Sequence, residues 1–264
     1  MNDSEPIGII GGSGFYSLLD DPEERPVETP WGAPSDVLTV GTLAGREVAF
    51  LPRHGRGHRF PPHLVPYRAN LWALRAAGVR QVVSLSAVGS LTTDRQPGAL
   101  VVPDQIVDRT WGRAHTYFSA AEGVGHVPFA DPYCPRGRAA ARAAGGANDG
   151  GTLVVVNGPR FSTRAESEEF QRNGWSIIGM TAMPEACLAR ELALCYTTLA
   201  LVTDLDAGVE AGGGVTHTEV LAAFAVNLPR LRELLVATLE RLPQVQGDCA
   251  CSERPGFPDG FVLP

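Results

Sequence analysis

Residues 7–16 read IGIIGGSGFY, a short apolar run followed by a turn built from Gly11, Gly12, Ser13 and Gly14. The run predicts a buried strand, and the glycines predict a tight turn where it ends. Such a turn can present backbone N–H groups to a phosphate, although a plain turn explains the residues equally well. A dinucleotide fingerprint would need glycine at Ser17, and a Walker loop would need lysine. The segment therefore predicts the first strand of an α/β fold and leaves its ligand open.

Similar apolar runs alternate with helical patterns along most of the chain. Further strands are predicted at residues 48–51, 81–85, 100–102, 153–156, 176–178 and 198–203. Helices are predicted at residues 67–77, 164–172, 184–196 and 218–241, with Pro184 and Thr218 at two of the helix starts and a kink at Pro229. This alternation predicts an α/β fold, a single domain with a central mixed β-sheet flanked by helices.

Two regions depart from this pattern. Residues 110–150 are rich in Gly, Ala, Arg and Pro, and we interpret them as an excursion with one helix near residues 138–144. Residues 249–264 are predicted to form an irregular C-terminal tail, so that the domain spans residues 1–248. At 264 residues, one large domain is expected rather than two.

The charge composition narrows the classes of partner and of chemistry. The chain has 22 Lys+Arg against 29 Asp+Glu, a formal charge of −7, and none of its residues is lysine. The absence of lysine excludes a phosphate-loop lysine and a lysine Schiff base. The acidic balance argues against a nucleic-acid partner, and no apolar run is long enough for a membrane span. With no secretory signal visible at the N-terminus, we expect a cytoplasmic protein.

The five cysteines are too scattered for a disulfide framework. Cys187 and Cys195 lie in apolar stretches and are expected to be reduced core thiols, whereas the surroundings of Cys134 are less clear. Cys249 and Cys251 form a C-A-C pair in the tail. A metal site at this pair would need two more ligands nearby, so we predict no metal site and leave a redox role unsupported.

A cluster of arginines and histidines follows the strand predicted at residues 48–51. The sequence LPRHGRGHR contains Arg53, His54 and His58. A solvated basic loop would not call for the histidines, and adjacent arginines would repel a divalent metal. An anion site fits better, because guanidinium groups form bidentate hydrogen bonds with oxyanions and an imidazole can donate a hydrogen bond.

Three later segments have weaker signals. SLSAVGSL at residues 84–91 is a buried strand ending in hydroxyls, whose backbone N–H groups could complete an anion site. NGPRFSTRAE and GMTAMPE read as strand-to-helix loops. LVTDLDAG places Asp204 and Asp206 two residues apart, on one face of a strand. A solvated strand end, metal binding and acid–base chemistry are all open for these two carboxylates.

Taken in order, these segments resemble the trimeric purine nucleoside phosphorylase family, in particular its methylthioadenosine phosphorylase branch. The matching motifs include IGIIGGSG, LPRHGRGH, SAVGSL, NGPRFSTRAES, GMTAMPEA and LVTDLDAG, between Ile7 and about Arg241. The resemblance implies the nucleoside phosphorylase fold and cleavage of an N-glycosidic bond by inorganic phosphate. It also implies a homotrimer that uses phosphate as a co-substrate and needs no cofactor.

The resemblance also implies roles for individual residues. Phosphate would be bound by Ser13, Arg53, His54, Ser86, the backbone of Ala87, and Thr181. Met180 would lie under the ribose, and Phe161 would stack near the base with Ser162 beside it. The family members that act on 6-oxopurines have glutamate at the position of Ser162 and asparagine at that of Asp204. The residues in this chain therefore imply an adenine pocket.

Asp204 is the predicted catalytic residue. Its carboxylate can accept a hydrogen bond from the 6-amino group, and its protonated form can donate to N7 as the base departs. Burial and the neighbouring Asp206, itself a predicted substrate contact, should raise the pKa of Asp204 toward neutrality.

The 5′ pocket departs from the methylthioadenosine pattern. His217 stands where that branch has a small apolar residue, and it resembles the histidine that binds the 5′-hydroxyl in ordinary purine nucleoside phosphorylases. His58 is expected in the same region, and His126 is expected to reach the pocket of a neighbouring subunit. We therefore predict phosphorolysis of 5′-methylthioadenosine or a related 5′-substituted adenosine. The alternatives are phosphorolysis of adenosine or 6-oxopurine nucleosides, and a non-catalytic nucleoside-binding protein.

Overall fold

The sheet is organised around one long strand, β5 (Gln81–Ser90), in the computed structural model, which describes residues 4–12, 19–120, 123–209, 214–254 and 256–264. These residues form an 11-stranded mixed sheet with the order β2-β3-β4-β1-β5-β10-β9-β7, while β11 pairs with β5 and β6, and β6 pairs with β8. The other strands are β1 (Ile7–Gly11), β2 (Asp20–Arg25), β3 (Leu38–Leu43), β4 (Arg46–Pro52), β6 (Leu100–Val102), β7 (Gln105–Arg109), β8 (Asn148–Asp149), β9 (Thr152–Val156), β10 (Ile177–Gly179) and β11 (Cys195–Leu205).

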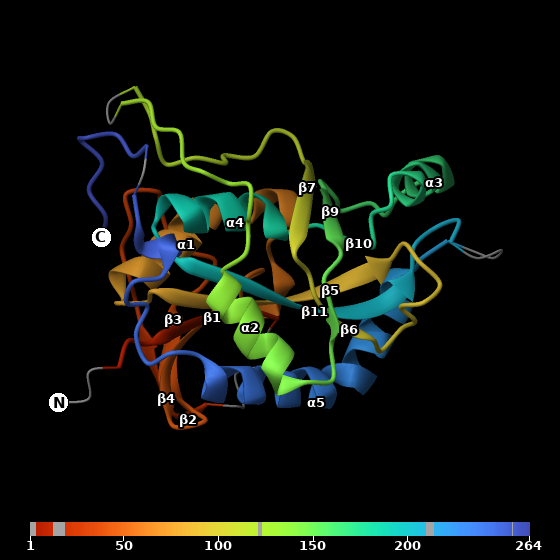
Figure 1. Cartoon of the computed structure of the whole chain (residues 1–264), viewed down its shortest axis with the longest axis horizontal. Helices are drawn as coiled ribbons and strands as arrows, with labels where there is room; N and C mark the ends of the chain where they lie inside the picture. The colour runs from red at the N-terminus through yellow and green to blue at the C-terminus, as the bar shows by residue number, and fades with distance from the viewer. Residues whose placement is uncertain (1–3, 13–18, 121–122, 210–213, 255) are drawn as a thin grey trace.

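Helices cover both faces of this sheet (Figure 1). Helices α1 (Tyr67–Ala76) and α4 (Ala182–Glu191) lie on one face, and α2 (Pro135–Ala144) and α5 (His217–Arg241) lie on the other, while α3 (Arg164–Arg172) stands at one end. Because side chains alternate along β5, Val82 and Val88 pack in the core under α1 and α4, whereas Val83 and Leu85 pack in the core under α5. The fold class predicted from the sequence, a single α/β domain with a mixed sheet, is confirmed. None of the helices in the described part of the chain combines the length and apolarity required to cross a membrane.

Every strand and helix predicted from the sequence is present, with shifted ends in most cases. The helix predicted at residues 184–196 ends at Glu191, because the chain from Cys195 onward extends β11. The last helix is capped by Thr216 and not by Thr218. The Thr216 hydroxyl accepts from the Glu219 N–H, and the Glu219 carboxylate accepts from the backbone N–H of Thr216. That helix also continues through Pro229.

The sequence reading missed four strands. The residues of β2 are DDPEER, all exposed, and this strand forms by antiparallel pairing with β3 rather than by burying an apolar face. β3, β7 and β8 were also missed. β7 directly precedes the excursion and β8 lies at its end, and the expected helix is present within it as α2. Short or polar edge strands carry little hydrophobic signal, so that their existence depends on the neighbouring strand.

Candidate functional site

The first two sequence motifs meet because their strands are parallel neighbours. β1 pairs with β4 in parallel, with Gly11 opposite Pro52, and the N–H of Arg53 donates to the carbonyl of Gly11 (2.9 Å). The carboxyl ends of parallel strands lie at the same edge of a sheet, which is where α/β proteins bind ligands. The glycine turn therefore begins beside the arginine–histidine segment.

A cavity of about 250 Å³ opens at this edge. Its volume is close to that of sites that bind small molecules. Twelve of the fourteen predicted site residues line it: Arg53, His54, His58, Ser86, Ala87, Phe161, Ser162, Met180, Thr181, Asp204, Asp206 and His217. Ser13 lies outside the described residues. The five sequence segments, which are far apart along the chain, thus contribute to one site.

His126 does not line this cavity. Its backbone N–H donates to the carbonyl of Gly256 (2.8 Å), and the residue is exposed on the excursion. Its expected contact with a neighbouring subunit stays a prediction.

A gap in the sheet exposes the backbone of β5 beside the cavity. On one edge of β5, β1 pairs only as far as Ser84, and β10 begins to pair at Gly89. Backbone groups of successive residues point to opposite edges of a strand. The carbonyl of Leu85 accepts from Arg53 in the gap, and the carbonyl of Val88 accepts from Thr203 of β11 on the other edge. The N–H of Ala87 therefore points into the gap, as an anion site requires.

Arg53 is the buried cation of the site, with 3% of the residue exposed. Its Nε donates to Glu185 (2.7 Å), its Nη2 donates to Glu185 (3.0 Å) and to Ser84 (2.7 Å), and its Nη1 donates to the carbonyl of Leu85 (2.9 Å). Burial alone would lower the pKa of Arg53, but the pair with Glu185 outweighs it and the net shift is upward. Within the described part of the chain, four of its five N–H groups have these partners, so that one on Nη1 can bind a ligand in the cavity.

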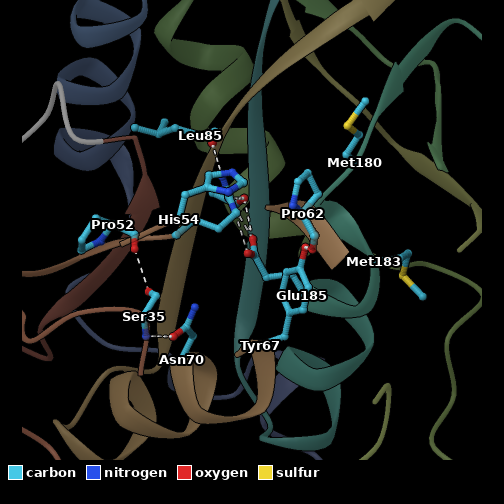
Figure 2. A network of polar contacts seen from close by, with 12 residues as sticks. Ser35, Pro52, His54, Pro62, Tyr67, Asn70, Leu85, Met180, Met183 and Glu185 are labelled. Atoms are coloured by element: carbon cyan, nitrogen blue, oxygen red, sulfur yellow. Dashed lines mark hydrogen bonds and ion pairs between the residues drawn. The ribbon is translucent and has the colours of Figure 1, made fainter. Parts of the chain in front are cut away.

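The backbone around Arg53 is held by hydrogen bonds to a neighbouring loop. Ser35 Oγ donates to the carbonyl of Pro52 (2.7 Å), and Ser35 N–H donates to Asn70 Oδ1 of α1 (2.7 Å) (Figure 2). The guanidinium is thus fixed both through its own contacts and through the chain that carries it.

Two hydroxyls that were predicted to bind an anion, those of Ser86 and Thr181, line the cavity. Ser86 Oγ is buried and makes no hydrogen bond with the part of the chain that the structure describes. Thr181 precedes α4, and its side chain makes no capping hydrogen bond. An unpaired buried hydroxyl costs free energy unless a ligand or water satisfies it, so Ser86 points to a polar ligand.

His54 differs from the expectation of an imidazole that donates to the anion. Its Nδ1 lies 2.8 Å from the carbonyl of Phe60, which can only accept, so Nδ1 carries the hydrogen. Burial, the charge of Arg53 and the neighbouring His58 lower the pKa of His54 to about 4. The ring is therefore neutral near pH 7, with an unprotonated Nε2 that accepts a hydrogen bond. A monoprotonated oxyanion can supply that hydrogen from its own hydroxyl.

Three histidines, His54, His58 and His217, line the cavity. The rings of His54 and His58 stack with their centroids 4.2 Å apart. Burial, and then the charge of His217, lower the pKa of His58. His217 is the first residue of α5 and is exposed. The histidine part of the lining is therefore polar and partly open to solvent.

Asp204 and Asp206 line the same cavity although only Asp204 belongs to β11. A register shift in β11 lies between Val202 and Asp204. The single hydrogen of the Thr203 hydroxyl is shared between Asp204 Oδ2 (2.8 Å) and the carbonyl of Val88 (3.2 Å). Burial raises the pKa of Asp204, the Thr203 hydroxyl opposes the shift, and the charge of Asp206 adds to it. Burial also raises the pKa of Asp206. The predicted direction for Asp204 is confirmed.

Two residues of the site were missed from the sequence. Glu185 is fully buried and accepts from Arg53, Ser84 and Tyr196. Arg113 belongs to the excursion, and it donates to the carbonyls of Asn157, Met180 and Met183, which holds the loops after β9 and β10 together. A glutamate inside an apolar helix was a usable signal for Glu185, whereas nothing near Arg113 in the sequence indicated its partners.

The cavity therefore combines two chemistries. Its lining offers an arginine N–H, hydroxyls and a backbone N–H to an oxyanion, and it also includes a carboxyl group with a raised pKa. A carboxyl group of this kind can donate a proton to a leaving group while the anion attacks the atom between them.

Comparisons with known proteins agree with this geometry. A model of the phosphorylase superfamily matches residues 6–240. A purine nucleoside phosphorylase of Streptomyces coelicolor is 58% identical, covering 98% of this chain and 97% of that protein, and an S-methyl-5′-thioadenosine phosphorylase of Mycolicibacterium smegmatis is 55% identical, covering 98% and 99%. The structure of methylthioadenosine phosphorylase from Schistosoma mansoni in complex with adenine superposes with a TM-score of 0.85 at 38% identity, covering 89% of this chain and 91% of that chain.

Proposed function

The chain belongs to the phosphorylase superfamily, and on that basis we propose that it catalyses the phosphorolysis of 5′-methylthioadenosine or a related 5′-substituted adenosine. It is a pentosyltransferase, with adenine and a 5-substituted ribose 1-phosphate as products. The observation that carries the proposal is the placement of the Arg53 anion site and the Asp204 carboxyl group in one cavity.

The reaction exchanges one bond at the sugar for another. An oxygen of phosphate forms a bond to C1′ while the bond from C1′ to N9 of the purine breaks, and the electron pair of that bond leaves with the base. A proton delivered to N7 neutralises the departing purine. No covalent bond to the protein forms, so a chain without lysine can carry out the whole reaction with phosphate as co-substrate and without a cofactor.

The phosphate dianion fits the donors and the acceptor on the anion side. Its unprotonated oxygens would accept from the free N–H of Arg53, from Ser86 and from Thr181, and the N–H of Ala87 would complete the set. Its hydroxyl would donate to Nε2 of His54, which is available because Nδ1 donates to Phe60. Preorganised donors of this kind hold the nucleophile without reorganisation during the reaction.

Adenine fits the opposite side. The 6-amino group is a donor and N7 is an acceptor, a pair that a protonated carboxyl group at Asp204 matches with its carbonyl oxygen and its hydroxyl. A 6-oxopurine has acceptors at both positions, so one of its two contacts with the same carboxyl group would be lost. The site therefore favours 6-amino over 6-oxo substrates.

The residues that line the cavity near the 5′ substituent favour a second candidate function. Met180 and Val220 give this part of the cavity apolar surface for a methylthio group, but His58 and His217 also line it. A histidine there can bind a 5′-hydroxyl, and the Streptomyces relative carries the name purine nucleoside phosphorylase. The second candidate is therefore phosphorolysis of adenosine or of 6-oxopurine nucleosides.

A panel of substrates tests both functions. We expect phosphate-dependent release of base with the highest kcat/KM for 5′-methylthioadenosine, followed by adenosine and 5′-halo-adenosines, and with methylthioinosine and inosine below their 6-amino counterparts. A higher kcat/KM for inosine than for 5′-methylthioadenosine would favour the second function. Absence of phosphate-dependent release from all five would refute both.

Gly89 provides a test of how Asp204 is positioned. A Cβ atom at this residue would lie 2.8 Å from Asp204 Oδ1 and 3.0 Å from Ile178 Cγ2. Gly89→Ala is therefore expected to displace the carboxyl group and to lower kcat/KM for 5′-methylthioadenosine by about 10- to 100-fold, because small displacements of a reacting group are costly. Steady-state kinetics with each substrate varied would measure this.

Gly179→Ala is the matched control for this test. Gly179 lines the same cavity on the neighbouring strand, but a Cβ there meets its neighbours at 3.4 and 3.5 Å, which is ordinary contact. Its effect on kcat/KM is expected to be several-fold smaller. Equal losses for the two variants would show that Asp204 is not what Gly89 accommodates.

We further propose that the chain acts as a cytoplasmic homotrimer in which His126 approaches the 5′ pocket of a neighbouring subunit. The support is the family resemblance and the position of His126, which is exposed and lies away from the cavity of its own chain. Sedimentation analysis would test the trimer, and the kinetics of His126→Ala would test the role of His126.

A further inference from the structure

Four cysteines from distant parts of the chain gather outside the nucleoside cavity. The Sγ atoms of Cys134, Cys195, Cys249 and Cys251 all lie within 4.8 Å of one another. The first three residues are buried and Cys251 is half-buried. Cys134 precedes α2 and Cys195 begins β11. Cys249 precedes a short 3-10 helix in the C-terminal segment (Ala250–Ser252), and Cys251 lies within it. The fold thus supplies the two additional ligands that the C-A-C pair lacked when the sequence alone was considered.

The separation of two of the thiols matches an edge of a tetrahedral metal site. Cys134 Sγ and Cys249 Sγ are 3.7 Å apart. With zinc–sulfur bonds of about 2.3 Å, the edge of a tetrahedral four-sulfur site is about 3.8 Å. A disulfide would need about 2.05 Å. A central ion therefore fits between these two sulfur atoms without a change in their separation.

N–H groups lie against two of the four sulfur atoms. The N–H of Gly137, in the first turn of α2, donates to Cys134 Sγ (3.5 Å), and Gln246 Nε2 donates to Cys195 Sγ (3.5 Å). The positive end of α2 points toward Cys134, which caps the helix. Hydrogen bonds from N–H groups and a helix N-terminus lower the free energy of thiolate ligands.

We propose that Cys134, Cys195, Cys249 and Cys251 bind one zinc ion as a closed structural site. Four sulfur ligands select zinc over the oxygen-preferring divalent cations and leave no coordination position for substrate. Binding replaces the thiol protons: one Zn²⁺ and four thiols give a four-thiolate complex and release up to four protons.

The ion would fasten the C-terminal segment to the domain. Beyond Cys251 this segment is held by Arg190, whose Nη1 donates to the carbonyls of Cys251 and Glu253, and its Phe257 and Phe261 pack against Phe118. Gly256 accepts from the backbone of His126. The site therefore connects β11 and α2 to the segment that supports the excursion.

The test uses the full-length chain, purified with a reductant and without chelator. Elemental analysis by mass spectrometry is expected to find one zinc per chain, and titration in denaturant is expected to find all five thiols. Cys251→Ser is expected to lower the zinc content at least tenfold. Cys187→Ser, which removes the cysteine outside the cluster, is expected to retain zinc. A zinc-free folded protein overturns the proposal, as does iron in place of zinc or the loss of two or four thiols to disulfides.

Removal of the metal from the unaltered chain provides a second test that does not depend on the folding of a variant. Chelation under reducing conditions is expected to lower Tm on the order of 10 °C, and added zinc, but not magnesium, is expected to restore it. Cobalt in place of zinc is expected to show the absorption of a tetrahedral thiolate site. A Tm that does not respond to chelation while the zinc content falls to zero would refute a structural role for the ion.

Discussion

Asp204→Asn is expected to lower kcat/KM for 5′-methylthioadenosine by about 100-fold or more, the usual effect of losing a positioned general acid. The carboxyl group is held on one side by the hydroxyl of Thr203, and its other oxygen lies beside Gly89. An amide at this position can donate a hydrogen bond to N7 but cannot transfer a proton. It also presents N–H donors, which suit the acceptors of a 6-oxopurine, so the preference for 6-amino substrates should narrow or reverse.

The pH dependence provides an independent readout of the same prediction. Because burial raises the pKa of Asp204, the protonated acid persists to higher pH than in an ordinary aspartate. Activity that needs the proton is lost as the pH rises through that pKa, and Asp204→Asn should lack this alkaline limb in its profile of kcat/KM.

Asp206→Asn is the matched control, since Asp206 also lines the cavity and burial also raises its pKa. We expect a much smaller loss of kcat/KM and an unchanged substrate preference. If Asp206→Asn reproduces both effects of Asp204→Asn, the general acid has been assigned to the wrong carboxyl group.

Glu185→Gln is expected to lower the free energy of unfolding by about 3–5 kcal/mol, the cost of leaving one partner of a buried ion pair uncompensated. Glu185 is fully buried and accepts two hydrogen bonds from Arg53, one from Ser84 and one from Tyr196. The amide N–H₂ of glutamine would face these donors. Denaturant and thermal unfolding would measure the loss.

Phosphate should partly rescue this variant. An anion bound to Arg53 compensates the charge that Glu185 no longer balances, and it binds only the folded state, so phosphate should raise the Tm of Glu185→Gln more than that of the unaltered protein. Equal shifts in the two proteins would show that Arg53 does not contact phosphate.

Glu191→Gln serves as the control for burial alone. Glu191 is also buried in α4, but it accepts from the Thr116 hydroxyl and the Tyr117 N–H rather than from a guanidinium. Its loss should cost about 1–3 kcal/mol, and phosphate should not rescue it selectively.

The sequence predicted the central elements well because those elements carry their own signals. Buried parallel strands read as continuous Val, Ile and Leu runs, so β1, β4 and the start of β5 were found. The helix predicted at residues 164–172 matches α3 at both ends, and Thr163 and Glu166 form a capping box at its start. The polar strand β2 has no such signal.

Motif residues at the ends of these strands were likewise foreseen, and their gathering in one cavity follows from parallel pairing. The protonation of His54 was not foreseen. It depends on the carbonyl of Phe60 and on the burial of the ring, neither of which is a property of the local sequence.

By itself, then, the sequence determined the α/β class, the central strands and the residues that could hold an anion and a base, since these depend on local periodicity and residue chemistry. The tertiary structure decided which distant side chains meet. Arg53 pairs with Glu185 across 132 residues, and Cys134 meets Cys249 across 115. Such contacts depend on how helices and strands pack against one another, and the residues next to them in the sequence do not predict them.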